Sequence, residues 1–558
     1  MKLAHFVFAG ACFASVVHAR SADACTTWET GAPLQTPSGV RHEIPVYLYA
    51  PDAASNETFV GQPTDWLEQE VRMAVDLWLE NSHADLRPYY AGRTSDRSAH
   101  GRIVIKQGTS VWCGDDAIGC TVPERSWSLF DGVKLSGATV HLNAGHSAPL
   151  REWVSIIAHE IGHGFGLADL YDTFNGRNCV WSYGPANIMG TYNANWFSGG
   201  SLGLDDQETM IKLYGPARRP ASYMESGDGI SWQDGSPPDS LKDLTLESRV
   251  SSSANRGTRA RYVESNGWSG LSAVSGCNLS SCAGETRQGL PEEGLWSFHP
   301  AAVADASSSE WLVAFTIGEA KSNPWRNVAV ARTTDGGASY QTAALRFGDS
   351  TLATRMGGVS ATYDPRSKTY LVVYRDIVLS DHLRSQTWLA VVDPGSNEIS
   401  SRTPMPGESF SVPAVECGEE GSASNCLLVW PSEQPMHLLA WTRFRVDGAS
   451  VILDELDPNL TLLHNYSMPA LTAFDGQKLS FVVALKREDG VYTHGLAGGG
   501  WSAPSLAVAH QHDEPVMSPT LAQVRGRDMT DTIGFSKLGP SADDTARELH
   551  LRYGATSR

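Results

Sequence analysis

The sequence predicts a multidomain protein in which an α+β domain precedes an all-β propeller of five or six blades. Three observations carry this expectation. The chain has 558 residues, which is too long for a single hydrophobic core. Its composition changes near residue 217, where a stretch rich in Gly, Pro, Ser and Asp begins. After this stretch, five similar units follow one another at intervals of 50–60 residues.

The charge of the chain excludes some partners. The formal net charge is -19, and a nucleic-acid surface needs clustered Lys and Arg, so we expect no nucleic acid. An anionic membrane surface is disfavoured for the same reason. After the N-terminal apolar run, no segment is long and apolar enough to span a membrane, so we expect no transmembrane segment.

Residues 1–24 have the features of a signal peptide. Lys2 supplies a positive start, and an apolar run from Leu3 to Val17 follows it. Small residues at Val17 and Ala19, or at Ala22 and Ala24, fit a cleavage site. We therefore expect an extracellular, secreted protein, most typical of bacteria.

Cysteine counting agrees with export. Cys12 leaves with the signal peptide, and an even number of cysteines remains, which suits disulfides in an oxidising compartment. Short spacings suggest the pairs Cys113–Cys120, Cys277–Cys282 and Cys417–Cys426. Cys25–Cys179 is then left by elimination. The alternative is that some of these cysteines are free thiols.

The first domain, residues 25–217, alternates element types. Periodic apolar residues predict a helix over 64–81, a second helix over about 150–164 and a third over 205–214. Asp205 and Asp206 suit the start of the third helix, because acidic groups favour helix N-termini. Short strands are expected over 44–49, 102–106 and 139–143.

A linker is expected over 218–254, and the repeated units occupy 255–558. Each unit opens on a short motif and continues with an apolar strand, as four-stranded propeller blades do. The five openings begin at His299, Val359, Val412, Met468 and Ser518. The stretch 259–268 is interpreted as a strand that closes the ring or as part of a sixth blade. A β-sandwich is the alternative fold.

The string from His159 to Asp169, HEIGHGFGLAD, carries the chemistry. Helix positions i and i+4 share a face, so His159 and His163 can present two imidazoles to one ion. Zinc accepts such nitrogen donors and keeps a position open for water in catalytic sites. Glu160 is placed to take a proton from that water. Glycines after His163 let the chain turn, so that Asp169 can return as the third ligand.

This string resembles the metzincin signature H-E-x-x-H-x-x-G-x-x-H, with Asp in the last place as in snapalysin-type secreted bacterial metzincins. Residues 40–216 resemble matrixin-like metzincins. The resemblance implies a zinc metalloendopeptidase with one catalytic Zn²⁺, a Met-turn at Met189 and an edge strand over 139–143 above the cleft. It also implies Tyr192 as a transition-state stabiliser, although its spacing does not match the family well.

Other interpretations of the first domain stay open. An H-E-x-x-H string can arise by chance, and a metzincin domain can be inactive. A gluzincin needs a downstream Glu on another helix, for which Glu208 is the near option. Structural Ca²⁺ is an option at the acidic pair Asp115 and Asp116, although surface acids without an ion are commoner.

The repeat domain offers a second class of function. The stretch from Thr333 to Tyr340 resembles the Asp-box of sialidase-like propellers, with Asp335 in the turn. Two functions therefore remain. The first is an endopeptidase acting on protein or peptide substrates, with a propeller that binds substrate, a surface glycan or another protein. The second is a glycan- or protein-binding, sialidase-like propeller that carries an inactive or accessory metal domain.

Overall fold

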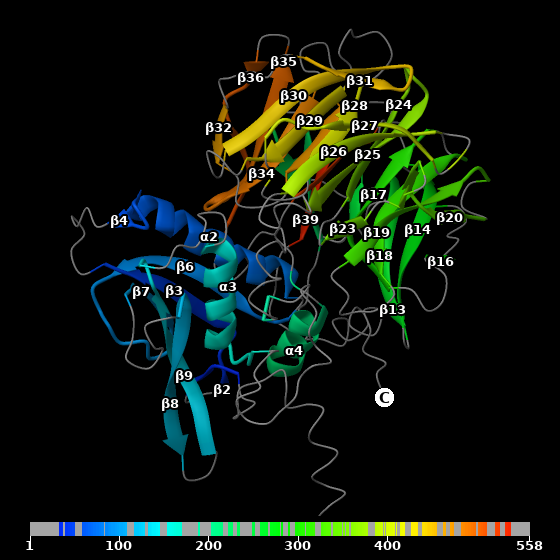
Figure 1. The fold of residues 1–558 in the computed structure, drawn as a ribbon. Coiled ribbons are helices and arrows are strands. Elements are labelled where there is room, and N and C mark those ends of the chain that lie inside the picture. The colour runs from blue at the N-terminus through cyan, green and yellow to red at the C-terminus, as the bar shows by residue number, and fades with distance from the viewer. Residues whose placement is uncertain are drawn as a thin grey trace, which may run out of the picture. The chain divides into compact units, whose positions relative to one another are not determined.

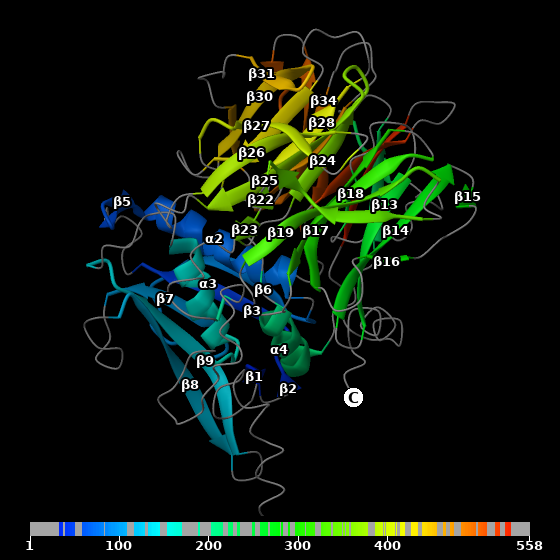
Figure 2. The same ribbon diagram turned by 45° about the vertical axis from the view of Figure 1, so that its right-hand side comes forward.

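The computed structural model describes residues 33–536 with gaps, and the longer gaps are 51–57, 109–116, 146–152, 170–187, 190–201, 235–247, 378–384, 419–425, 474–480 and 511–518. The chain divides into two compact units, residues 1–215 and 216–558. Figures 1 and 2 show the helices and strands of both units. In the described part of the chain, no helix has both the length and the apolar character needed to cross a membrane.

The first unit contains one five-stranded sheet and three described helices. The sheet has the order β6-β3-β7-β9-β8, and it is parallel except that β8 runs antiparallel to β9. Its strands are β3 (Glu43–Tyr49), β6 (Arg87–Thr94), β7 (Ile103–Gln107), β8 (Gly119–Ser128) and β9 (Gly132–Leu142). Two small pairs accompany it: β1 (Gln35–Thr36) with β2 (Gly39–Val40), and β4 (Thr58–Phe59) with β5 (Gln62–Pro63).

Helices α2 (Thr64–Asn81) and α3 (Trp153–Gly164) pack against each other and against the sheet (Figure 1). The apolar stripe of α3 is buried as its periodicity predicts, with Val154, Ile157 and Ala158 at most 3% exposed. The indole Nε1 of Trp78 donates a 2.8 Å hydrogen bond to the Ala158 carbonyl, which ties α2 to α3. The third helix, α4, spans Leu204–Tyr214.

One detail of the predicted sheet is wrong. We expected the segment 139–143 to form the edge strand above the cleft. Residues 132–142 form β9, which has a neighbour on each side, and β8 is the edge strand instead. The order of strands in a sheet depends on pairing between distant segments, so the local pattern could not distinguish these two strands.

The second unit is built of β-sheets, and five of them repeat. The first sheet contains β12 (Ser248–Val250), β17 (Trp296–Asp305), β18 (Trp311–Gly318), β19 (Trp325–Thr333), β20 (Gln341–Ala344) and β23 (Ala353–Arg355). The second sheet contains β24 (Val359–Asp364), β25 (Thr369–Ile377), β26 (Ser385–Val392) and β27 (Ile399–Pro404), and the third contains β28 (Ala414–Cys417), β29 (Cys426–Pro431), β30 (Leu438–Asp447), β31 (Ser450–Leu453) and β32 (Thr461–His464). The fourth sheet contains β33 (Ala470–Ala473), β34 (Phe481–Arg487), β35 (Gly490–Ala497), β36 (Gly500–Trp501) and β37 (Ser505–Ala509).

The fifth sheet joins the two ends of this unit. Its order is β11-β10-β39-β38, so β38 (Thr520–Val524) and β39 (Thr530–Ser536) pair with β10 (Ala221–Ser226) and β11 (Gln233–Asp234). The closing strand β10 lies in a stretch that the sequence analysis treated as a linker. The stretch 259–268 was interpreted as a strand that closes the ring or as part of a sixth blade. It does not close the ring and belongs to a separate sheet of β13 (Gly257–Ser265), β14 (Trp268–Asn278), β15 (Ser281–Cys282) and β16 (Gln288–Leu290).

The first strands of the five repeated sheets form a closed ring. Strands β17, β24, β28, β33 and β38 contact one another in that order. The last of them contacts β12, which pairs with β17 in parallel. The small pair β21 (Arg346–Phe347) and β22 (Ser350–Thr351) lies outside this ring of sheets. The described strands therefore form a propeller-like, β-rich unit with five blades.

Apolar cores between successive sheets hold the blades together. In β25, Tyr370 and Val372 face the first sheet, whereas Leu371 and Val373 face the third. Side chains alternate between the two faces of a strand, so a strand buried on both faces has a continuous apolar run. The same alternation places Leu427 and Val429 of β29 against the fourth sheet. This explains why the second strand of each unit could be recognised in the sequence as an apolar run.

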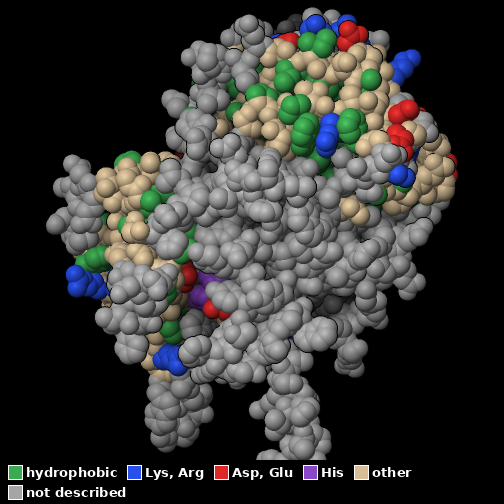
Figure 3. All heavy atoms as spheres, in the orientation of Figure 1, with side chains coloured by type: hydrophobic (Ala, Val, Ile, Leu, Met, Phe, Trp, Pro, Cys, Tyr) green, Lys and Arg blue, Asp and Glu red, His purple; other side chains and the backbone are tan. Residues whose placement is uncertain are grey.

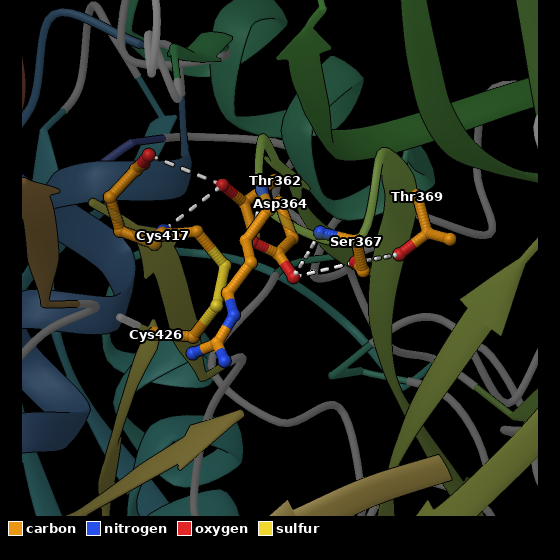
Figure 4. The surroundings of a disulfide bond; sticks show 8 residues. Thr362, Asp364, Ser367, Thr369, Cys417 and Cys426 are labelled. Atoms are coloured by element: carbon orange, nitrogen blue, oxygen red, sulfur yellow. Dashed lines mark hydrogen bonds between the residues drawn. A yellow bond between two sulfur atoms is a disulfide. The ribbon is translucent and has the colours of Figure 1, made fainter. Parts of the chain in front are cut away.

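A disulfide joins two strands of the third blade. Cys417 and Cys426 are cross-strand partners of β28 and β29 and are bonded, as predicted (Figure 4). Next to them, the Asp364 carboxylate accepts hydrogen bonds from Ser367 and holds the turn that follows β24.

The other predicted cysteine pairs are described in part. Cys120 is disulfide-bonded. Cys277 and Cys282 stand opposite each other in β14 and β15. Cys25, Cys113 and Cys179 lie outside the described residues.

Candidate metal centre

Three candidate ligands from one stretch of chain lie together in the first unit. The ligand atoms of His159, His163 and Asp169 are all within 4.8 Å of one another. The Nε2 atoms of the two imidazoles lie 3.1 and 3.2 Å from the same carboxylate oxygen, Oδ1 of Asp169. The structure thus brings together the three residues that the sequence singled out as ligands.

The end of α3 explains how Asp169 returns to the imidazoles. The backbone N–H groups of Phe165, Gly166 and Leu167 donate to carbonyls of the last helical turn. Gly166 has a φ of 103°, a conformation that only glycine adopts at low cost, and it turns the chain back toward the helix. The Leu167 carbonyl then accepts a hydrogen bond from Nδ1 of His163 at 2.9 Å.

Both rings are oriented through their second nitrogen. Nδ1 of His159 lies 2.8 Å from the Ile188 carbonyl oxygen, and Nδ1 of His163 is held by Leu167 in the same way. A carbonyl only accepts, so each Nδ1 must carry the hydrogen. Nε2 is then the nitrogen available to a ligand, and on both rings it faces Asp169. Such backbone partners fix the tautomer and the direction of metal-binding histidines.

The electrostatics of the site favour a positive charge between these groups. Burial opposes protonation of His159, but its contact with the Asp169 carboxylate outweighs burial and raises the pKa of the ring to about 9. The pKa of His163 is raised for the same reason. Burial would raise the pKa of Asp169, but the two rings outweigh it and lower that pKa. A divalent cation bound between the two rings and the carboxylate would supply this positive charge in place of protons on the rings.

The donor set fits a zinc ion. Two imidazole nitrogens and one carboxylate oxygen are ligands that Zn²⁺ accepts, and three protein ligands leave one position for water. His159 and Asp169 keep 16% and 28% of their side-chain surface exposed, so the site is accessible from solvent. In Figure 3 histidine and acidic side chains meet at the surface of the described part of the chain.

Glu160 lies next to this cluster but makes different contacts. It is 6% exposed, and its carboxylate Oε2 lies 2.8 Å from the hydroxyl of Thr121 on β8. The Cα of Gly119, also on β8, comes so close that an added Cβ would lie 3.0 Å from Oε1 of Glu160. Sequence reasoning identified Glu160 but missed both β8 residues, because nothing in their local pattern indicates that they meet α3.

Met189 and Ile188 form the turn that supports His159. Both are buried, and their backbone N–H groups point to the carboxylate of Asp206 on α4, with 3.3 Å from Met189 to Oδ1. The sulfur of Met189 packs against Gly162, where an added Cβ would lie only 2.5 Å from it. Asp206 was expected only as a helix-terminal charge, and its role as acceptor for this turn is a finding of the structure.

The remaining candidates are Tyr192, the acidic pair and Glu208. Tyr192 and the acidic pair Asp115 and Asp116 lie outside the described residues. Glu208, the ligand that a gluzincin would need, lies in α4.

No protein-family model and no curated protein matches the chain. Among solved structures, an α-L-arabinanase from Penicillium chrysogenum is similar, with 9% identity, a TM-score of 0.33 and coverage of 58% of this chain and 98% of the arabinanase. An exo-β-1,3-galactanase from Phanerochaete chrysosporium has 11% identity and a TM-score of 0.27, over 43% of this chain and 60% of that chain. The Dos1 propeller has 11% identity and a TM-score of 0.26, over 54% and 71%.

These comparisons correct the sequence-based assignment. The similar structures named above are two carbohydrate-acting enzymes and a propeller, not metzincins, and no family model supports a metzincin. The metzincin assignment and the zinc metalloendopeptidase activity that it implied are therefore not retained. The physical reason is that H-E-x-x-H sets the spacing of two imidazoles on one helix, and it specifies neither the substrate nor the activity.

Proposed function

We propose that this chain is a secreted binding propeller with an accessory metal domain, in which His159, His163 and Asp169 hold one divalent ion, expected to be Zn²⁺. The observation that carries the proposal is the convergence of three ligand atoms within 4.8 Å, with both imidazoles directed by backbone carbonyls. Oriented imidazoles and a nearby carboxylate are the arrangement that zinc sites use.

The residues around the ion supply the parts of a hydrolytic centre. A bound Zn²⁺ lowers the pKa of water and polarises a substrate oxygen. With an ion held there, the buried carboxylate of Glu160 would be the group that accepts a proton beside it. Each Nδ1–H is engaged by a carbonyl, so both rings are fixed and would present Nε2 to the ion.

The matched variants Glu160→Gln and His163→Ala test this division of roles in the full chain. We expect Glu160→Gln to keep one zinc ion and to lose hydrolysis, while His163→Ala loses both. The assay is chelator-sensitive turnover of a panel of dye-labelled polysaccharide, chromogenic glycosides and esters, and dye-labelled protein. Turnover by Glu160→Gln at the rate of the original chain would remove Glu160 from the proposal.

The propeller-like unit is proposed to bind a glycan or a protein partner. Five blades in a closed ring present strand ends and turns on two faces, which is the usual binding architecture of propellers. A glycan array and a surface-protein library probed with the full chain test this part. Saturable binding that survives the His163→Ala substitution supports a binding propeller, and no binding in either screen contradicts it.

A further inference from the structure

The edge strand β8 contributes two residues that surround Glu160, and neither has a role in the site as described so far. Gly119 and Thr121 are two residues apart, and side chains alternate along a strand, so both positions face α3. One position carries a hydroxyl that contacts the Glu160 carboxylate, and the other carries no side chain. Together they define where that carboxylate can lie.

The hydroxyl of Thr121 makes two short contacts with the same residue. Oγ1 lies 2.8 Å from Oε2 of Glu160 and 2.7 Å from the backbone carbonyl oxygen of Glu160. A hydroxyl has one hydrogen, so this hydrogen is shared between two acceptors, the carboxylate and the main-chain carbonyl of Glu160, and it holds the Glu160 side chain on the β8 side. Among the described residues, this is the one hydrogen bond that the structure gives to the Glu160 carboxylate.

The second residue, Gly119, leaves the space in which the carboxylate lies. A Cβ at this position would come within 3.0 Å of both Cγ and Oε1 of Glu160 and 3.2 Å from Cγ2 of Ile156. These distances are tighter than nine in ten real Cβ contacts, so a side chain at position 119 would push Glu160 or Ile156 aside by a few tenths of an ångström. A carboxylate that is 6% exposed also needs a hydrogen-bond partner to avoid a large desolvation cost.

We propose that Thr121 is a positioning residue for Glu160, and that Gly119 provides the space this position requires. The inference rests on the proposed function, because it assigns Thr121 a role through the base of that centre. Thr121 touches neither the ligands nor the expected position of the ion, so its loss should leave metal binding intact. What it should change is the rate at which Glu160 takes a proton.

Three variants of the full chain test the inference. Thr121→Val removes the hydroxyl and keeps the shape, Thr121→Ser keeps the hydroxyl, and Thr139→Val is the control. Thr139 is buried on the neighbouring strand β9, and it points away from α3, because the adjacent Ala138 is the residue that meets the helix at Gly164.

We expect Thr121→Val to lower kcat about 10- to 100-fold, as loss of an outer hydrogen bond does at metal sites. KM and zinc content should be unchanged, and Thr121→Ser should restore most of the rate.

A crystal structure of zinc-loaded Thr121→Val gives a readout that does not depend on activity. The inference predicts that the Glu160 carboxylate leaves its position beside β8 or occupies more than one rotamer. A carboxylate that stays in place, or an equal loss of kcat in Thr139→Val, would overturn the inference. If the original chain binds no metal, the proposed function fails, and the position of Glu160 in the metal-free Thr121→Val crystal still decides between the two outcomes.

Discussion

Nδ1 of His159 lies 2.8 Å from the backbone carbonyl oxygen of Ile188. This contact directs the opposite nitrogen, Nε2, toward Asp169, which lies 3.1 Å away. The Ile188 backbone is itself held by the carboxylate of Asp206, which accepts from its N–H. The direction of a proposed metal ligand on α3 therefore depends on an acidic residue of α4.

The first prediction concerns Asp206. Replacing it by Ala removes the acceptor for the Ile188 and Met189 N–H groups, and the turn that orients His159 loses its support. We expect zinc affinity to fall about 10- to 100-fold, as measured by competition with a chromophoric chelator. Leu213→Ala is the matched control, because Leu213 is a buried residue of the same helix whose apolar side chain offers the turn no hydrogen-bond acceptor. Equal affinity in Asp206→Ala and the original chain would refute this dependence.

The second prediction concerns the close packing at Gly162. An added methyl group would lie 2.5 Å from the Met189 sulfur and 2.7 Å from Cζ2 of Trp78. Alanine favours a helix over glycine by about 1 kcal/mol, but overpacking a core costs about 1–3 kcal/mol. We therefore expect Gly162→Ala to lower the free energy of unfolding in denaturant titrations. The free-energy cost of Gly162→Ala should be smaller when residue 189 is alanine than when it is methionine. Equal costs in the two backgrounds would show that the crowding is absent.

The third prediction is a pH dependence at the hairpin of Asp335. Its carboxylate accepts hydrogen bonds from the Ser339 hydroxyl at 2.6 Å, the Ser339 N–H at 2.9 Å and the Thr333 hydroxyl at 2.8 Å, and these lower its pKa to about 2. A lowered pKa stabilises the fold above the ordinary value of 3.8, and the stabilisation is lost as the pH falls from there through about 2.

The comparison with Asp335→Asn isolates this contribution. The difference in unfolding temperature between the original chain and the variant should shrink between pH 4 and pH 2, since other carboxylates affect both proteins alike. Direct titration of the Asp335 carboxyl by NMR in the folded protein is the second measurement. An ordinary pKa there would show that the three hydrogen bonds do not form in solution.

The fourth prediction concerns closure of the propeller ring. Met224 of β10 pairs with Ile533 of β39, so Met224→Pro removes a backbone donor from a strand with neighbours on both sides. We expect the free energy of unfolding of the second unit to fall by about 1–3 kcal/mol, the cost of leaving a buried hydrogen-bonding group without its partner. The control is Gln233→Pro on β11, an edge strand, where proline is tolerated better. Equal effects of the two substitutions would argue against this closure.

Several features of the fold could be predicted because their signals are local. The helix over 64–81 has the predicted bounds, and the second strands of all five blades were visible as apolar runs. The disulfide Cys417–Cys426 was also predicted correctly, since two cysteines nine positions apart can face each other across one hairpin. In each case the deciding contacts lie within one element or one turn.

Features that depend on distant contacts were missed. Thr121 meets Glu160 across 39 positions, and Asp206 meets Ile188 across 18, with no motif to mark either pair. The strand 221–226 closes the ring by pairing with 531–536, although its Gly- and Pro-rich surroundings suggested a linker. The activity was assigned wrongly for a related reason, because a local motif indicates metal chemistry without fixing the substrate.

Metal content tests the central claim most directly. Full-length protein is incubated with Zn²⁺ and dialysed to remove unbound ions, and its zinc content is measured by inductively coupled plasma mass spectrometry. The His159→Ala/His163→Ala double variant and a His141→Ala control are treated in the same way. The account predicts one tightly held zinc ion per chain in the original protein and in the control, and none in the double variant. Zinc retained by the double variant, or no zinc in the original chain, would contradict it.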